Sequence, residues 1–340
     1  MKLDTTLDGP LRQAGDEAAH AEQDGYDGIW TTEIAHEPFF PLLLAADRTE
    51  TISVGTGIAV AFARNPMTTA YAAWDLQAQS GGRFLLGLGS QIKPHVERRF
   101  SMPWGQPAAR MKEYVSALQA IWASWQHGSR LDFSGDFYTH TLMTPFFDPG
   151  PLESGAPAVL IAAVGDGMTR VAGEVADGML VHGFTTERYL REVTLPLLEE
   201  GLRSRKRDRE TFSVTYPALV ATGHTEEQLA VAVAGTRKQI AFYGSTPAYR
   251  ATLDLHGWGD LQPELHALSK QDRWDEMGGL IDDDVLHAFA IVAAPDEVAT
   301  IMHKRFDGVV DRIRLYQPYD SPAEVAQQVL ATFHEQAGVR

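Results

Sequence analysis

The chain has 340 residues, of which 44% are hydrophobic and 22% charged, so it can bury the core of a large globular protein. Its 45 acidic residues outnumber its 29 basic ones, and the formal net charge of -16 would repel a nucleic-acid backbone or an anionic membrane surface. Because there is no cysteine, disulfides, thiolate nucleophiles and cysteine-held metal sites are excluded, and redox chemistry would need a bound cofactor.

The start of the chain carries acidic residues and no apolar run, and no later segment approaches the roughly 18 apolar residues of a membrane span. We therefore expect a cytoplasmic protein with neither nucleic-acid nor membrane partners.

Short apolar segments rich in β-branched residues alternate with longer segments of helical period, which is the pattern of parallel βα units. The eight predicted strands are residues 2–6, 28–32, 52–58, 84–88, 158–163, 178–181, 212–221 and 312–316. The predicted helices are residues 11–24, 40–50, 68–79, 108–124, 168–176, 188–203, 225–243 and 295–306. Eight strand-helix repeats predict an α/β protein with a (β/α)8 TIM barrel, formed by residues 1–340 as a single domain.

Two long irregular segments account for the length beyond the roughly 250 residues usual for this fold. Residues 126–156, rich in Gly, Pro, Phe and Asp, predict a hairpin or loop. Residues 244–294, with Trp258 and Trp274, predict a helical lid, in which the acidic run at Asp282 begins a helix. Both insertions are expected at the carboxyl ends of the strands.

The active site of such a barrel lies at the carboxyl ends of its strands, which restricts the candidate residues to those that follow each strand. After the fifth strand the chain passes through a glycine-bearing turn into a helix, whose free backbone N–H groups can bind an anion such as a phosphate. The turn consists of Ala162, Ala163, Val164, Gly165, Asp166, Gly167 and Met168. An ordinary βα turn without a ligand is the alternative.

Three titratable residues follow predicted strands and can carry a proton. Glu33 and His36 follow the second strand, and His182 follows the sixth. Each can equally be a hydrogen-bonded residue without a catalytic role. No paired-ligand spacing of the HExxH kind is present, so no metal is expected.

Several motifs, in order along nearly the whole chain, resemble those of the luciferase-like superfamily. They are Val54-Gly55-Thr56-Gly57-Ile58, Arg64-Asn65-Pro66-Met67, Ser80-Gly81-Gly82-Arg83-Phe84 with Leu86-Gly87-Leu88-Gly89, Ala172-Gly173-Glu174-Val175-Ala176-Asp177-Gly178 and Pro295-Asp296-Glu297-Val298. Within the superfamily, the segment 89–113 is most similar to members that use the deazaflavin coenzyme F420, and flavin mononucleotide (FMN)-dependent monooxygenases are the near alternative.

The resemblance implies site residues as well as a fold. It implies a non-prolyl cis peptide at Gly57-Ile58 that supports the cofactor ring, a phosphate-binding role for residues 162–168, and a cofactor contact from Glu33. It also implies a small-molecule substrate and a homodimer formed through outer helices.

The segment after the second strand departs from the family pattern. Many deazaflavin dehydrogenases of the family carry Asp-His there, whereas this chain reads Glu33-Ile34-Ala35-His36. Glu33 can replace the acid, but Ile34 stands in the position of the catalytic base. We therefore expect hydride transfer with coenzyme F420, with an FMN-dependent monooxygenase and a cofactor-binding protein without catalysis as alternatives.

Overall fold

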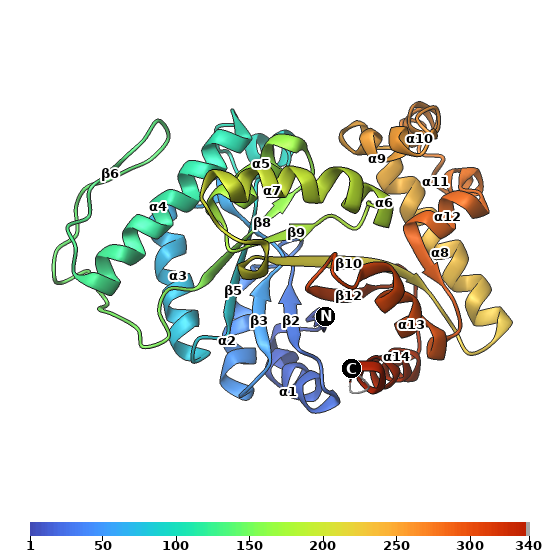
Figure 1. Cartoon of the computed structure of the whole chain (residues 1–340), viewed down its shortest axis with the longest axis horizontal. Helices are drawn as coiled ribbons and strands as arrows, with labels where there is room; N and C mark the ends of the chain where they lie inside the picture. The colour runs from blue at the N-terminus through green and yellow to red at the C-terminus, as the bar shows by residue number, and fades with distance from the viewer. Residues whose placement is uncertain (338–340) are drawn as a thin grey trace. The chain divides into compact units, whose positions relative to one another are not determined.

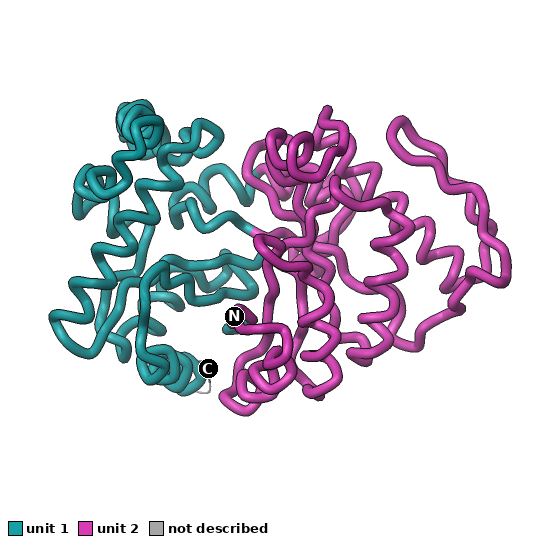
Figure 2. Tube along the Cα trace, turned by 180° about the vertical axis from the view of Figure 1, so that it is seen from behind, with its two compact units in different colours: residues 1–3, 181–196, 214–340 teal, residues 4–180, 197–213 magenta. Residues whose placement is uncertain are grey.

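The computed structural model describes residues 1–337, which divide into two compact units (Figure 2). Unit 1 comprises residues 1–3, 181–196 and 214–337, and unit 2 comprises residues 4–180 and 197–213. The fold class is the predicted (β/α)8 barrel, in which parallel strands alternate with helices. The single-domain assignment stays a prediction.

Unit 2 contains a parallel sheet in the order β1-β2-β3-β5-β8-β9, with the short β4 also paired to β5. Its strands are β1 (Lys2–Thr6, from Asp4 on), β2 (Gly28–Thr31), β3 (Ser53–Thr56), β4 (Ala59–Val60), β5 (Phe84–Gly89), β8 (Ala158–Ala163) and β9 (Gly178–Val181, up to Leu180). They are mostly buried on both faces, because helices cover one side and neighbouring side chains fill the other.

Helices connect these strands (Figure 1). The ends of two of them, α1 and α3, carry the residues that are expected at helix ends. They are α1 (Ala14–Asp24), α2 (Phe39–Arg48), α3 (Pro66–Gln79), α4 (Pro107–His127), α5 (Asp166–Val175) and α7 (Leu195–Ser204, from Leu197 on). Asn65 caps α3 by accepting a hydrogen bond from the Met67 amide at 2.8 Å, with Pro66 in the first turn. Gly25 ends α1 in the left-handed conformation (φ 100°), which a residue without a Cβ adopts at little cost.

Unit 1 contains the remaining parallel strands, in which β10 pairs with both β11 and β12. The strands are β10 (Ser213–Ala221, from Val214 on), β11 (Ala290–Val292) and β12 (Arg312–Tyr316). The helices are α6 (Glu187–Tyr189), α8 (Glu226–Gly244), α9 (Arg250–Leu255), α10 (Leu261–Ser269), α11 (Trp274–Met277), α12 (Asp283–Phe289), α13 (Pro295–Phe306) and α14 (Ala323–Ala337). A buried cluster that includes Phe184, Ile240, Leu265 and Phe289 holds α8 to α12 together.

Both insertions have the predicted kind of local structure, but the predicted position was wrong for residues 126–156. This segment leads from the end of α4 into the start of β8, so it begins and ends at the amino end of that strand and not at the carboxyl end. Residues 126–156 contain an antiparallel pair, β6 (Phe133–Ser134) and β7 (Thr139–His140), beside α4 (Figure 1). The Glu113 carboxylate of α4 accepts hydrogen bonds from the amides of residues 136 to 138 and fastens the hairpin. Residues 244–294 are largely helical, and Asp282 caps α12 by accepting from the Val285 amide at 2.9 Å.

All eight predicted strands are present, although the third one ends at Thr56 instead of residue 58. The elements that were missed include the two-residue β4, β11 and α14. β11 is only three residues long, and it lies within the segment assigned to the lid. The last helix, α14, follows the final strand and contributes the buried Val325, Val329 and Phe333.

Candidate functional site

The carboxyl ends of the unit 2 strands lie at one edge of the sheet, because all of these strands are parallel and in register. Thr31 of β2 pairs with Thr56 of β3, and Leu88 of β5 pairs with Ile161 of β8. The segments after β2, β3 and β8, which contain most of the predicted site residues, therefore leave the sheet on the same side.

Glu33 is buried and held by two donors. Its Oε2 accepts from the Val60 amide at 2.7 Å and from Arg64 Nη1 at 2.6 Å, and only 8% of the residue is exposed. The second terminal nitrogen of Arg64 contacts Glu37 Oε1 at 3.0 Å. Burial alone would lower the pKa of Arg64, but the two carboxylates outweigh it and raise that pKa. The guanidinium is therefore fixed as a cation between two acids.

The peptide bond between Gly57 and Ile58 is cis, which confirms the expectation from the family resemblance. The Gly57 amide donates to the Thr31 carbonyl at 2.7 Å, and the Glu33 amide donates to the Ile58 carbonyl at 3.2 Å. The segments after β2 and β3 are thus hydrogen-bonded to each other, and Glu33, Gly57 and Ile58 are neighbours.

The turn between β8 and α5 has the open geometry predicted for an anion site. Residues 164–167 are exposed, and a Cβ built on Gly165 would meet no heavy atom within 4 Å. The first turn of α5 offers backbone N–H groups that a helix cannot pair internally. The nearby Arg170 contacts Glu200 at 2.7 Å, so the turn presents amides and not a cation. This open, donor-rich turn fits a phosphate group.

His36 is exposed, in the same loop as Glu33, and Ile34 is 71% exposed beside it. The structure thus brings Glu33 together with Arg64 and Glu37, and leaves His36 on the surface of the loop. Sequence reasoning missed Arg64 and Glu37 as site residues. Two features of the sequence could have indicated them. Arg64 directly precedes the Asn-Pro helix start, and the loop after the second strand contains two acids, Glu33 and Glu37.

His182 belongs to unit 1 and lies among aromatic rings. Its Nδ1 accepts from the Phe184 amide at 3.0 Å, and its Nε2 lies 3.2 Å from the Tyr249 hydroxyl. The rings of His182 and Tyr249 stack with centroids 4.5 Å apart. Burial lowers the pKa of His182 to about 4, so its imidazole is neutral at pH 7.

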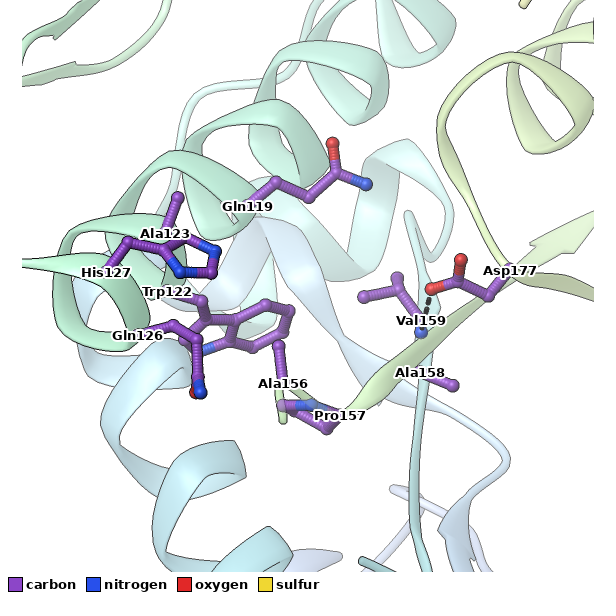
Figure 3. A pocket seen from close by; sticks show the side chains of 10 residues that line it. All are labelled: Gln119, Trp122, Ala123, Gln126, His127, Ala156, Pro157, Ala158, Val159 and Asp177. Atoms are coloured by element: carbon purple, nitrogen blue, oxygen red, sulfur yellow. Dashed lines mark hydrogen bonds between the residues drawn. The ribbon is translucent and has the colours of Figure 1, made fainter. Parts of the chain in front are cut away.

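A pocket of about 460 Å³ lies between α4 and the start of β8 (Figure 3). Its lining includes Trp122, Gln126 and Asp177, and Asp177 accepts a hydrogen bond from the Val159 amide at 3.0 Å. The pocket is at the amino end of β8 and contains none of the predicted site residues. It is therefore separate from the site at the carboxyl edge.

Within residues 1–337, no helix is long and apolar enough to cross a membrane.

Comparison with known proteins identifies relatives over the whole barrel. The family model described as luciferase-like monooxygenase matches residues 2–312. An uncharacterized protein of Mycobacterium tuberculosis is 56% identical over 313 residues, which are 92% of this chain and 92% of that protein. The F420-dependent glucose-6-phosphate dehydrogenase of Intrasporangium calvum is 30% identical over 218 residues, which are 58% of this chain and 62% of that enzyme.

A solved structure shows the same fold. The coenzyme F420-dependent tetrahydromethanopterin reductase from Methanopyrus kandleri aligns with a TM-score of 0.78, at 20% identity, over 97% of this chain and 96% of that one.

Proposed function

Because the chain belongs to the luciferase-like monooxygenase family, we propose that it is an oxidoreductase that transfers a hydride between coenzyme F420 and a small organic substrate. The observation that carries this proposal is the open glycine turn at the start of α5, on the same edge of the sheet as Glu33, Gly57 and Ile58. A phosphate-bearing planar cofactor needs such an anion site beside a flat backbone surface.

Each group of residues has a distinct task in this proposal. The backbone of residues 162–168 would hold the phosphate, and Gly57 and Ile58 would lie against the ring. Glu33 would contact the cofactor from the loop after β2. Arg64 and the Val60 amide fix the position of its carboxylate. When bound, coenzyme F420 would donate or accept two electrons as a hydride at C5 of the deazaflavin.

The protein itself must bind the substrate, exclude water and manage one proton. Glu33, His36 and His182 are the proton carriers expected from the sequence, and Glu33 and His36 remain proposed. Hydrogen bonds to the Phe184 amide and the Tyr249 hydroxyl occupy both ring nitrogens of His182, which is therefore not proposed as a carrier. His36 is exposed, and its side chain forms no hydrogen bond within residues 1–337. A cytoplasmic location and a lid role for residues 244–294 remain proposals too.

The first test is a side-by-side titration of the purified protein with coenzyme F420 and with FMN, followed by the fluorescence of its seven tryptophans. We expect micromolar or tighter binding of coenzyme F420 and much weaker binding of FMN. The Gly165→Asp variant places a carboxylate in the anion turn, where the added side chain meets nothing within 4 Å. It should weaken F420 binding by about tenfold or more, because the turn then repels the phosphate.

Gln327→Glu is the control, since it adds a carboxylate at an exposed position of α14, in unit 1 and outside both the proposed cofactor residues and the proposed lid. It should leave both affinities unchanged. A preference for FMN would instead favour an FMN-dependent monooxygenase, the second candidate, which the family description supports. Binding of neither cofactor would contradict both functions.

A further inference from the structure

Four partly exposed rings in unit 1 form what we call the His182 cluster: His182, Tyr243, Tyr249 and Tyr316. His182 directly follows β9, Tyr243 is near the end of α8, Tyr249 lies in the turn before α9, and Tyr316 ends β12. Ring centroids are 4.8 Å apart for His182 and Tyr243, and 6.4 Å apart for Tyr243 and Tyr316. The fold thus collects these rings from four separate segments, with two of them at the carboxyl ends of strands.

The hydrogen bonds fix the tautomer of His182. Its Nδ1 lies 3.0 Å from the Phe184 amide nitrogen, which can only donate, so this ring nitrogen carries no proton. A neutral imidazole then has its proton on Nε2, and this N–H donates to the Tyr249 hydroxyl oxygen at 3.2 Å. Both ring nitrogens are occupied, so His182 has no lone pair left with which to accept a proton from a ligand.

The same reasoning shows that some tyrosine hydroxyl protons of the cluster have no acceptor within residues 1–337. Tyr249 accepts from His182, so its own O–H proton is still to be donated, and residues 1–337 provide no other hydrogen-bond partner for that hydroxyl. The Tyr243 and Tyr316 hydroxyls lie 2.9 Å apart, and their single shared hydrogen bond uses one proton of two. Burial, with a smaller contribution from Tyr243, raises the pKa of Tyr249 to about 12, so its hydroxyl stays protonated at pH 7.

We propose that Tyr249 is the substrate-binding donor of this cluster, that His182 is a positioning residue acting through it, and that the ligand is an uncharged organic molecule with a carbonyl oxygen on a flat apolar body. The proposal deepens the proposed oxidoreductase function and rests on it for the identification of the ligand as a substrate. The rings supply apolar contact area, and the hydroxyl protons that have no acceptor within residues 1–337 can be donated to a ligand oxygen. An acid would bring a charge that these neutral hydroxyls and the neutral imidazole do not balance.

The first experiment measures the tautomer of His182 directly, by long-range ¹H–¹⁵N NMR of the imidazole in the full-length protein between pH 8 and pH 5.5. A neutral ring protonated on Nε2 across this range is expected, with an altered Nε2–H shift in Tyr249→Phe, which removes the acceptor. A ring protonated on Nδ1, or an unchanged Nε2–H shift in Tyr249→Phe, would overturn the assignment of His182.

The second experiment measures binding of three probes by calorimetry, with and without coenzyme F420. The probes are acetophenone, its isostere α-methylstyrene, which lacks the oxygen acceptor, and benzoate, which is charged. We expect acetophenone to bind best, and Tyr249→Phe to weaken it by roughly fivefold to tenfold while changing α-methylstyrene less than twofold. The control is Tyr26→Phe, which removes a hydroxyl from a half-buried ring in unit 2 and should change none of the affinities.

Equal acetophenone affinity in Tyr249→Phe and the wild type would contradict the role of Tyr249, and tighter binding of benzoate or no binding of acetophenone would contradict the ligand class. The tautomer and probe measurements without cofactor do not depend on coenzyme F420. A failure of the F420 titration therefore removes the proposed function while these results still decide the role of Tyr249.

Discussion

At the scale of single residues, Glu33 and Glu37 both contact the Arg64 cation but differ in how deeply they are buried. The Glu33 side chain is 6% exposed and the Glu37 side chain is 35% exposed. Each also accepts a backbone amide at 2.7 Å, Glu33 from Val60 and Glu37 from Phe39. An exposed ion pair contributes little to stability, because water solvates both partners when the pair breaks. Removing one partner of a buried pair leaves an unpaired charge and is much more costly.

We therefore expect Glu33→Gln to lower the free energy of unfolding by about 3 kcal/mol, and the matched Glu37→Gln to lower it by about 1 kcal/mol or less. Both variants remove one acid from Arg64, so the difference between them reports burial. Urea unfolding at pH 7 measures both values. Equal losses would show that the Arg64 contact does not depend on the burial of Glu33.

At the scale of elements, Glu22 links the end of α1 to the segment that leads into β3. Its carboxylate accepts from the amides of Glu50, Thr51 and Ile52 at 2.6 to 3.1 Å, and from the Thr51 hydroxyl at 2.8 Å. Burial by itself raises the pKa of Glu22, but these hydrogen bonds outweigh it and lower the pKa to about 2. One side chain thus fixes the start of a strand against a helix distant in sequence.

The direction of this shift predicts how stability depends on pH. Because the folded pKa of Glu22 lies below its ordinary value of 4.5, the stabilisation is fully present above pH 4.5 and is lost as the pH falls toward 2. Glu22→Gln should lower the free energy of unfolding at pH 7 by about 1 kcal/mol, a figure reduced for solvent exposure, and should flatten this part of the pH profile.

Thermal unfolding of Glu22→Gln and the wild type between pH 7 and pH 2.5 measures the effect. Glu335→Gln, at an exposed position of α14, is the control and should follow the wild type. Parallel profiles for Glu22→Gln and the wild type would mean that the hydrogen bonds from these four donor groups do not hold the carboxylate in its charged form.

At the scale of the whole molecule, the net charge of -16 opposes self-association, yet α2 carries an apolar outer face. Phe40 is 61% exposed, Leu43 45% and Leu44 39%, although solvent-facing positions of a helix are normally polar. We propose that this face is buried between two copies of the chain, in keeping with the homodimer that the family resemblance implies.

The expected result is a dimer in analytical ultracentrifugation at micromolar concentration, and a shift to monomer in Leu43→Glu, because a charge in an apolar interface is costly to desolvate. Leu142→Glu changes an apolar residue that is 78% exposed on the hairpin insertion, and it should leave the dimer intact. A monomeric wild type, or dissociation by Leu142→Glu alone, would contradict the assignment of the interface to α2.

The sequence by itself determined most of the elements of this protein and their class. Alternating β-branched and helical segments, Asn65-Pro66 and Gly25 at helix ends, and the family motifs were enough to predict the (β/α)8 barrel, the cis bond at Gly57-Ile58 and both kinds of insertion. The strands, helices and helix ends depend on local backbone preferences and short-range periodicity, which a sequence displays directly. The cis bond was expected only because the family resemblance implies it. The short β11 was not predicted, because three residues carry almost no periodic signal.

Only the tertiary structure decided which side chains act together. Arg64 lies 31 positions from Glu33, and Tyr249 lies 67 positions from His182, so neither pair is visible as a motif. Burial, hydrogen-bond occupancy and tautomer depend on neighbours that folding brings from other elements. For the same reason the sequence selects His182 as a titratable residue, whereas the fold occupies both of its nitrogens and leaves the free hydroxyl proton on Tyr249.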